Sequence, residues 1–314
     1  MPTLHVAGFW RRAAAFLIDM LLLGVVGWIA GVFFFDAFAK LGSYGRTVGF
    51  LVAMAYFVPF DSRLGNGQTL GKRILGVQVA NAQGQCLSVP RALMRYVVIG
   101  VPFFLNGFFS TSGWNSTLAK YIVSPALSLI VFGGLLSLIY LYIFNRRTRQ
   151  SLHDLAVGSY VIRVKNTQPA KPLQVLWRIH VVVVGVIALL SLTVPVIVAT
   201  RLKQPEEQLT HLLPAWQQLS ALPNVHHAQV SDISNIINNQ KTHYVAVTLW
   251  LDTPNTNDKT LAENAARIAA AHDDTLTKKD SVLVQLSHGY DIGISSFWRS
   301  QSYQFKLEEL QTPR

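Results

Sequence analysis

Long apolar runs, separated by basic and polar loops, dominate the first two thirds of the chain. A helix needs about 20 consecutive apolar residues to cross a bilayer. The first, fourth and fifth runs reach roughly that length, and the second and third are shorter. We interpret all five as membrane helices. The runs cover residues 13–35, 47–60, 96–109, 125–144 and 179–200.

From residue 205 onward the pattern is that of a soluble domain. Residues 225–233 and 244–251 alternate apolar and polar positions, as half-buried strands do. Two further short strands are predicted at 282–287 and 302–307, and helices at 205–222 and 257–272. These elements predict a small α+β domain, and its roughly 110 residues are enough to bury a core.

The predicted fold class is therefore a membrane all-α helical bundle followed by a small soluble α+β domain. The bundle has a four-span core and a fifth span. Within the loop between the second and third spans, residues 74–79 and 85–89 flank the turn-forming sequence Asn-Ala-Gln-Gly and predict a small β-hairpin. The predicted domains are a transmembrane domain at 1–165, a cytoplasmic linker at 166–178, a fifth helix at 179–200 and a periplasmic domain at 205–314.

Basic residues are concentrated in the apolar part of the chain and predict its orientation. Residues 1–200 hold 17 Lys and Arg against 4 Asp and Glu, whereas residues 201–314 hold 10 against 12. Segments 62–95 and 145–178 are the richest in Lys and Arg, and such loops stay on the cytoplasmic side. Five spans then predict a multi-pass inner-membrane protein with a cytoplasmic N-terminus and a periplasmic C-terminal domain.

Composition narrows the classes of function. Excess Lys and Arg in an apolar region indicates membrane orientation, so we expect no nucleic-acid partner. A single cysteine, Cys86, excludes an intrachain disulfide. The histidines show no metal-ligand spacing, and no nucleophile–histidine–acid set can be argued. We therefore expect no metal, no cofactor and no enzymatic activity.

Asp19 is the carboxylate placed well inside a predicted span. A charged Asp at the centre of a membrane helix costs about 2.5–3.5 kcal/mol, so such residues mark ion paths, proton relays or structural pairs. Arg12 lies seven residues earlier on the same helix face, roughly 10 Å away along the axis. That is too far for direct contact. We expect a partner from elsewhere in the chain, with Arg12, Arg91 and Arg95 as the first candidates.

Three sequence blocks resemble the RDD family of membrane proteins, which is named for one arginine and two aspartates. They are Arg12, Ala15, Ile18 and Asp19, the run GQTLGKRILGV at 67–77, and SLHDL at 151–155. The resemblance covers about residues 5–164 and assigns Arg12, Asp19 and Asp154 as the named residues. It implies an integral membrane protein. A cation/proton antiport activity has been associated with some members.

Other polar residues near the predicted membrane surface have plainer roles. Lys72, Arg73, Arg91 and Arg95 are expected to face lipid headgroups or line the loops as basic residues. Asp154 precedes an apolar segment, and we favour a helix cap or a surface ion pair for it over a transport role.

Two hypotheses of function follow. In the first, the core moves a small cation or protons, with Asp19 as the titrating group. In the second, the core is an anchor, and the C-terminal domain binds an envelope protein partner as a scaffold or sensor. Besides the lipid bilayer, the partners considered are that periplasmic protein and a second copy of the chain in a homo-oligomer.

Overall fold

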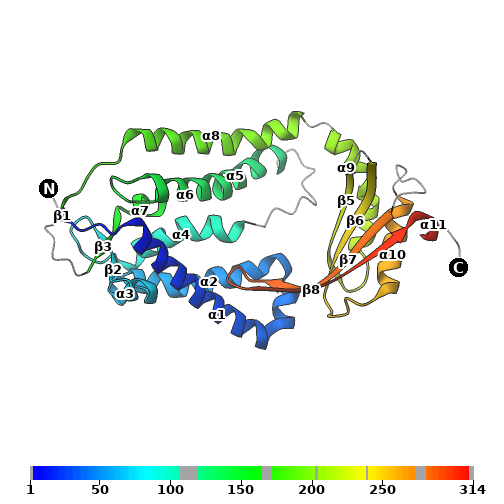
Figure 1. The fold of residues 1–314 in the computed structure, drawn as a ribbon, viewed down its shortest axis with the longest axis horizontal. Coiled ribbons are helices and arrows are strands. Elements are labelled where there is room, and N and C mark those ends of the chain that lie inside the picture. Colours follow the sequence, from blue (N-terminus) through cyan, green and yellow to red (C-terminus); the bar gives the residue numbers. More distant parts are fainter. Residues whose placement is uncertain are drawn as a thin grey trace. The chain divides into compact units, whose positions relative to one another are not determined.

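The computed structural model describes residues 3–106, 119–164, 171–201, 204–237, 240–272 and 281–310. The chain divides into two compact units. The first comprises Met1–Trp28, Arg46–Arg201 and Ile292–Ser295. The second comprises Ile29–Gly45, Leu202–Asp291 and Ser296–Arg314. Figure 1 shows the elements of both units along the chain.

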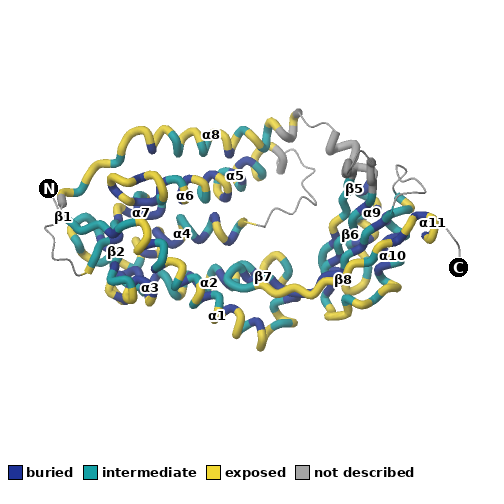
Figure 2. The backbone as a smooth tube through the Cα atoms, viewed as in Figure 1, coloured by how far each residue is buried: buried dark blue, intermediate teal, exposed yellow. Residues whose placement is uncertain are grey.

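Apolar helices form most of the first unit, as the sequence predicts. Three stretches among the described residues are long and apolar enough to cross a membrane, at Phe9–Asp61, Tyr121–Phe144 and Arg178–Ile197. Large apolar residues are exposed along the last of these, α8 (Arg178–Arg201), and Figure 2 colours many positions of this helix as exposed. The helical character is confirmed, whereas the count of five spans stays a prediction. Further helices of the unit are α1 (Phe9–Leu41) up to Trp28, α2 (Gly45–Asp61), α4 (Val89–Leu105), η3 (Ala119–Val123), α5 (Ser124–Ser128), η4 (Leu129–Gly133) and α6 (Gly134–Phe144). The rest of α1 and η1 (Gly42–Tyr44) belong to the second unit.

Short elements connect these helices, and one of them corrects a prediction. The strand β2 (Val77–Asn81) pairs antiparallel with β3 (Ser159–Arg163), about eighty residues away in the chain, and not with residues 85–89. The expected hairpin is therefore wrong, although Asn81 and Gln85 still form a turn. Long-range pairing wins because Val77, Val79 and Val161 bury together. The remaining short elements are η2 (Arg63–Gly65), α3 (Leu70–Ile74), α7 (Leu152–Val157) and the pair β1 (Thr3–Leu4) and β4 (Lys171–Pro172).

A four-stranded sheet forms the centre of the second unit, with strand order β5-β6-β7-β8. The strands are β5 (Val225–Ile237), β6 (Gln240–Leu251), β7 (Ser281–Asp291) and β8 (Ser296–Lys306). The β6–β7 pairing is parallel, since α10 (Lys259–Ala271) crosses between these strands, and the other two pairings are antiparallel. The helices α9 (Gln204–Ser220) and α11 (Leu307–Leu310) complete the unit. The predicted C-terminal sheet domain is confirmed.

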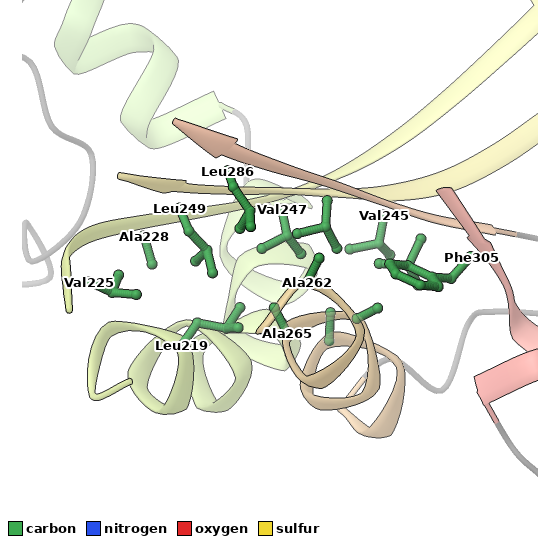
Figure 3. Close-up of a cluster of buried hydrophobic side chains, with 14 of the residues drawn as sticks. Leu219, Val225, Ala228, Val245, Val247, Leu249, Ala262, Ala265, Leu286 and Phe305 are labelled. Carbon is green, nitrogen blue, oxygen red and sulfur yellow. The ribbon is translucent and has the colours of Figure 1, made fainter. Parts of the chain in front are cut away.

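The core of this sheet domain lies between one sheet face and the helices α9 and α10, as Figure 3 shows. Alternate residues of β6, from Val245 to Leu251, point into it and meet the alanine stripe of α10. Alanine at Ala262, Ala265 and Ala269 lets the helix approach the sheet closely. The opposite sheet face carries mainly uncharged polar residues, such as Gln229, Thr248, Gln285 and Ser302, which the strand register places in one row.

Candidate functional site

Asp19 is fully buried in the first unit, and three groups hydrogen-bond to its carboxylate. The Tyr56 hydroxyl of α2 donates to Oδ1 at 2.7 Å, and the backbone amide of Gly71 donates to the same oxygen at 2.9 Å. The Thr69 hydroxyl donates to Oδ2 at 2.6 Å. One carboxylate thus fastens α1 to α2 and to the start of α3, where Thr69 is the N-cap.

These partners correct the expectation that an Arg or Lys would pair with Asp19. Two hydroxyls and a backbone amide carry no formal charge, yet they satisfy the carboxylate with charge-assisted hydrogen bonds. The close fit depends on glycine at position 71, because a Cβ there would collide with the carbonyl oxygen of Ala15. Gly71, in the 67–77 block, therefore lets the α3 backbone reach Asp19.

The charged side chains expected near Asp19 instead form an ion-pair network with two other aspartates. Arg12 donates to Asp154 at 2.8 Å, and Arg95 donates to Asp154 at 2.9 Å and 3.1 Å. Arg95 also donates to Asp61 at 2.6 Å, and the Lys72 amine pairs with the other Asp61 oxygen. Charges alternate along the series Lys72–Asp61–Arg95–Asp154–Arg12.

The local folds of α7 and α1 place the two ends of this network. Asp154 lies in the first turn of α7, where it and Ser151 form a capping box. The Ser159 hydroxyl donates to Asp154 as well, at 3.1 Å. Arg12 donates to the backbone carbonyl of Arg149 and lies 4.8 Å from the centre of the Tyr142 ring. Asp154 is a helix cap, as expected, but its ion pairs are buried and not on the surface.

Among the described residues of this unit, the buried charges are balanced. Asp19, Asp61 and Asp154 are at most 3% exposed, and Arg12, Lys72 and Arg95 at most 9%. Three carboxylates therefore accompany three cations. Removing one partner of a buried pair leaves an uncompensated charge, which costs about 3–5 kcal/mol. The arrangement is stable as a set and intolerant of single losses.

The residue before Asp154 is buried without charge. Burial lowers the pKa of His153 to about 3, although the Asp154 carboxylate opposes this shift. His153 is therefore neutral at pH 7, and its Nδ1 is buried without a hydrogen-bond partner. Burial alone would raise the pKa of Asp154. The charge of His153 in its protonated form, the positive charges of Arg95 and Arg12, and the Arg95 hydrogen bond hold that pKa well below its usual value.

Of the four basic residues expected at the membrane surface, two are buried and two are exposed. Lys72 and Arg95 are buried in the ion-pair network, so a headgroup role for them is wrong. Arg73 and Arg91 are exposed, as a headgroup role requires.

Sequence reasoning missed Asp61 because this residue looked like the polar end of the second span. The scarcity of acids was a usable signal, since Asp61 is one of four among residues 1–200.

The described part of the chain contains no candidate metal cluster, because no group of three or more His, Cys, Asp or Glu side chains there is arranged to hold a metal ion. The buried carboxylates accept hydrogen bonds from arginine, lysine, hydroxyl and amide donors. This geometry can fasten helices together.

Comparison with known proteins agrees with this geometry. The sequence profile of the RDD family matches residues 6–158, which include every member of the network. Residues 6–158 are an RDD family region. The predicted resemblance is confirmed, and the fifth helix and the sheet domain lie outside the match. Of the three residues that the resemblance assigns as the family's named residues, Arg12 and Asp154 form an ion pair, and Asp19 is held by hydroxyls and an amide.

One curated bacterial protein is similar to part of this chain. The chain is 25% identical over 143 residues to the uncharacterized protein YxaI of Bacillus subtilis (strain 168), and the match covers 36% of this chain and 93% of that protein. No solved structure matches the chain significantly. The RDD likeness is therefore carried by residues 6–158, and the sheet domain lies outside it.

Proposed function

We propose that this protein is a membrane-anchored binding protein, in which the RDD region holds the chain in the membrane and the sheet domain binds an envelope partner. The observation that carries the proposal is the hydrogen bonding of the buried Asp19 carboxylate. A carboxylate that cycles protons or cations must exchange its partners, whereas Asp19 accepts three hydrogen bonds of 2.6–2.9 Å from two separate segments, α2 and the start of α3. A structural brace explains this arrangement without any moving part.

The balanced ion-pair network supports the same proposal. Arg95 contacts Asp61 and Asp154 at once, so freeing either carboxylate for a transported ion would leave a buried arginine partly unpaired. A transporter would have to compensate that cost in every cycle. An anchor never has to separate these ion pairs after it has folded.

The sheet domain supplies the binding function in this proposal. Its helices cover one sheet face, and the other presents hydroxyl and amide side chains. A protein partner is the favoured ligand because a domain beyond the RDD region is unnecessary for anchoring. We propose no catalytic role.

Topology completes the proposal. The basic loops at 62–95 and 145–178 favour the cytoplasmic side of the inner membrane, which sends the sheet domain to the periplasm. Reporter fusions after Arg73 and after His272 should report opposite sides. A cytoplasmic signal from both would require a different span count.

Photocrosslinking in intact cells tests the binding function. A photoreactive residue at Gln229 or Ser302, on the open sheet face, should give discrete crosslinked bands of higher mass. The matched control is Asn264, exposed on α10 of the same domain. Equal crosslinking from all three positions, or none from the open face, would contradict a binding role for that face.

A further inference from the structure

The segment at residues 63–74, which contains η2 and α3, has one buried and one exposed side. Gly65, Thr69, Gly71 and Lys72 are buried, and the last three hold Asp19 or Asp61. The exposed side carries large apolar residues, Leu64 at 70% exposure and Ile74 at 71%, with Leu70 between them. Arg63 and Arg73 are exposed on the same segment. This 63–74 segment is therefore amphipathic, with its polar contacts turned inward.

The inward contacts fix the segment against the helices of the first unit. A Cβ at Gly65 would collide with the backbone of Phe60, the penultimate residue of α2. Gly71 lies against Ala15 of α1 in the same way. The backbone of the segment is therefore fixed, and with it the orientation of the exposed side chains of Leu64, Leu70 and Ile74.

The position along α1 places this exposed side at membrane depth. Ala15 and Asp19 follow Arg11 by four and eight residues, which is about 6 and 12 Å along a helix axis. Arg11 donates to the backbone carbonyl of Leu75 at 3.2 Å, so the segment runs from the level of Arg11 along the first turns of α1, at the cytoplasmic boundary between headgroups and hydrocarbon. Exposed leucine and isoleucine suit that depth, and arginine can extend from it to the phosphates.

We propose that the 63–74 segment is a binding site for an anionic phospholipid. Leu64, Leu70 and Ile74 contact the acyl chains, and Arg63 and Arg73 bind the headgroup phosphate. Charge complementarity favours this occupant, because Arg63, Arg73 and Arg91 are exposed in residues 62–95, a segment whose sequence contains no acid. The Arg73 guanidinium lies 5.8 Å from the centre of the Phe60 ring, which holds it at the edge of the helix.

Lipid titration of the purified full-length protein tests the site. In detergent, phosphatidylglycerol should raise the thermal unfolding midpoint of the wild type more than phosphatidylcholine does. The double variant R63Q/R73Q should bind phosphatidylglycerol at least tenfold more weakly. R63K/R73K, which keeps both charges, should retain most of the preference. The double variant L64S/I74S should weaken the binding of both lipids, because acyl contacts do not depend on the headgroup.

The matched control is R146Q/R147Q, which removes two exposed arginines from a different basic loop. This control should bind phosphatidylglycerol like the wild type. Equal weakening in both double variants would assign the preference to the general basic surface and overturn the site. A wild type without preference for phosphatidylglycerol, or one stabilised equally by inorganic phosphate, would also overturn it. Arg73→Gln alone, measured by counting retained lipids in native mass spectrometry, gives a second readout.

Discussion

Thr69 Oγ1 donates a 2.6 Å hydrogen bond to Asp19 Oδ2, and so joins two of the sequence blocks that identify the RDD region across fifty residues. Thr69 also caps α3, so the same side chain starts a helix and binds the buried carboxylate. The RDD blocks are therefore parts of one packing arrangement. Asp19 acts as the acceptor around which α1, α2 and α3 assemble.

Substitutions of Asp19 should follow its hydrogen bonds. Asp19→Ala leaves three donors without their acceptor, which we expect to cost several kcal/mol of unfolding free energy, at about 1–3 kcal/mol for each. Asp19→Asn keeps an acceptor oxygen and should cost only about 1–2 kcal/mol. Chemical unfolding in detergent measures both. The control Asp36→Asn alters an exposed carboxylate and should change stability by less than about 0.5 kcal/mol. Equal effects of Ala and Asn would contradict the hydrogen-bonding role.

Arg95 should be the most sensitive cation of the network. Arg95→Met leaves Asp61 and Asp154 without their shared partner, and we expect a loss of about 3–5 kcal/mol. Arg91→Met, one turn earlier on α4 and exposed, is the matched control and should stay within about 0.5 kcal/mol of the wild type. Thermal unfolding of the two variants side by side distinguishes them. Similar losses at both positions would mean that the network adds nothing specific.

Acid should destabilise the first unit through His153. Its folded pKa of about 3 lies below the unfolded value of 6.5, so its contribution is complete above pH 6.5 and is lost as pH falls toward 3. Between pH 6.5 and 5.0 this loss approaches about 2 kcal/mol. His153→Gln should flatten the dependence in that range. If unfolding midpoints of wild type and variant fall in parallel from pH 7.5 to 5.0, His153 is not the responsible group.

The sheet domain offers a test of its core. Leu249→Ala removes a fully buried side chain between the sheet and α10, and we expect a cost of about 2–5 kcal/mol. Thr248→Ala, on the next residue and the opposite face, should cost less than about 1 kcal/mol. Denaturant unfolding of the two variants is the measurement. The reverse order would place the core on the wrong face.

Local patterns predicted much of this fold. The alternation of apolar and polar positions predicted strands of the sheet domain, and Val245, Val247 and Leu249 do face its core. The apolar runs gave the helices. The hairpin prediction was wrong because the backbone of residues 77–81 hydrogen-bonds to β3. That strand lies far away in the sequence, so no local pattern could indicate the pairing. Strand pairing at that range depends on which surfaces bury together.

Part of the site was predictable in its residues, and its pairing was not. Asp19 could be selected because charged residues are rare inside membrane spans, and Arg12 and Asp154 because of the resemblance to the RDD family, whereas Asp61 was missed. The partners could not be selected, since a hydroxyl or a backbone amide satisfies a carboxylate as well as a cation does. Thr69 and Gly71 lay in the quoted motif, yet nothing in their spacing showed that they face Asp19. Three-dimensional contact supplied that information.

Ion flux in proteoliposomes tests most directly whether Asp19 is a brace. The purified wild type and Asp19→Asn would be reconstituted separately, and proton-coupled movement of Na⁺ and K⁺ recorded under an imposed pH gradient. We predict no flux above that of protein-free liposomes for either protein, with both correctly folded. Flux in the wild type that Asp19→Asn abolishes, while the variant keeps its unfolding midpoint within a few degrees, would make Asp19 a transport residue and contradict the proposed anchor.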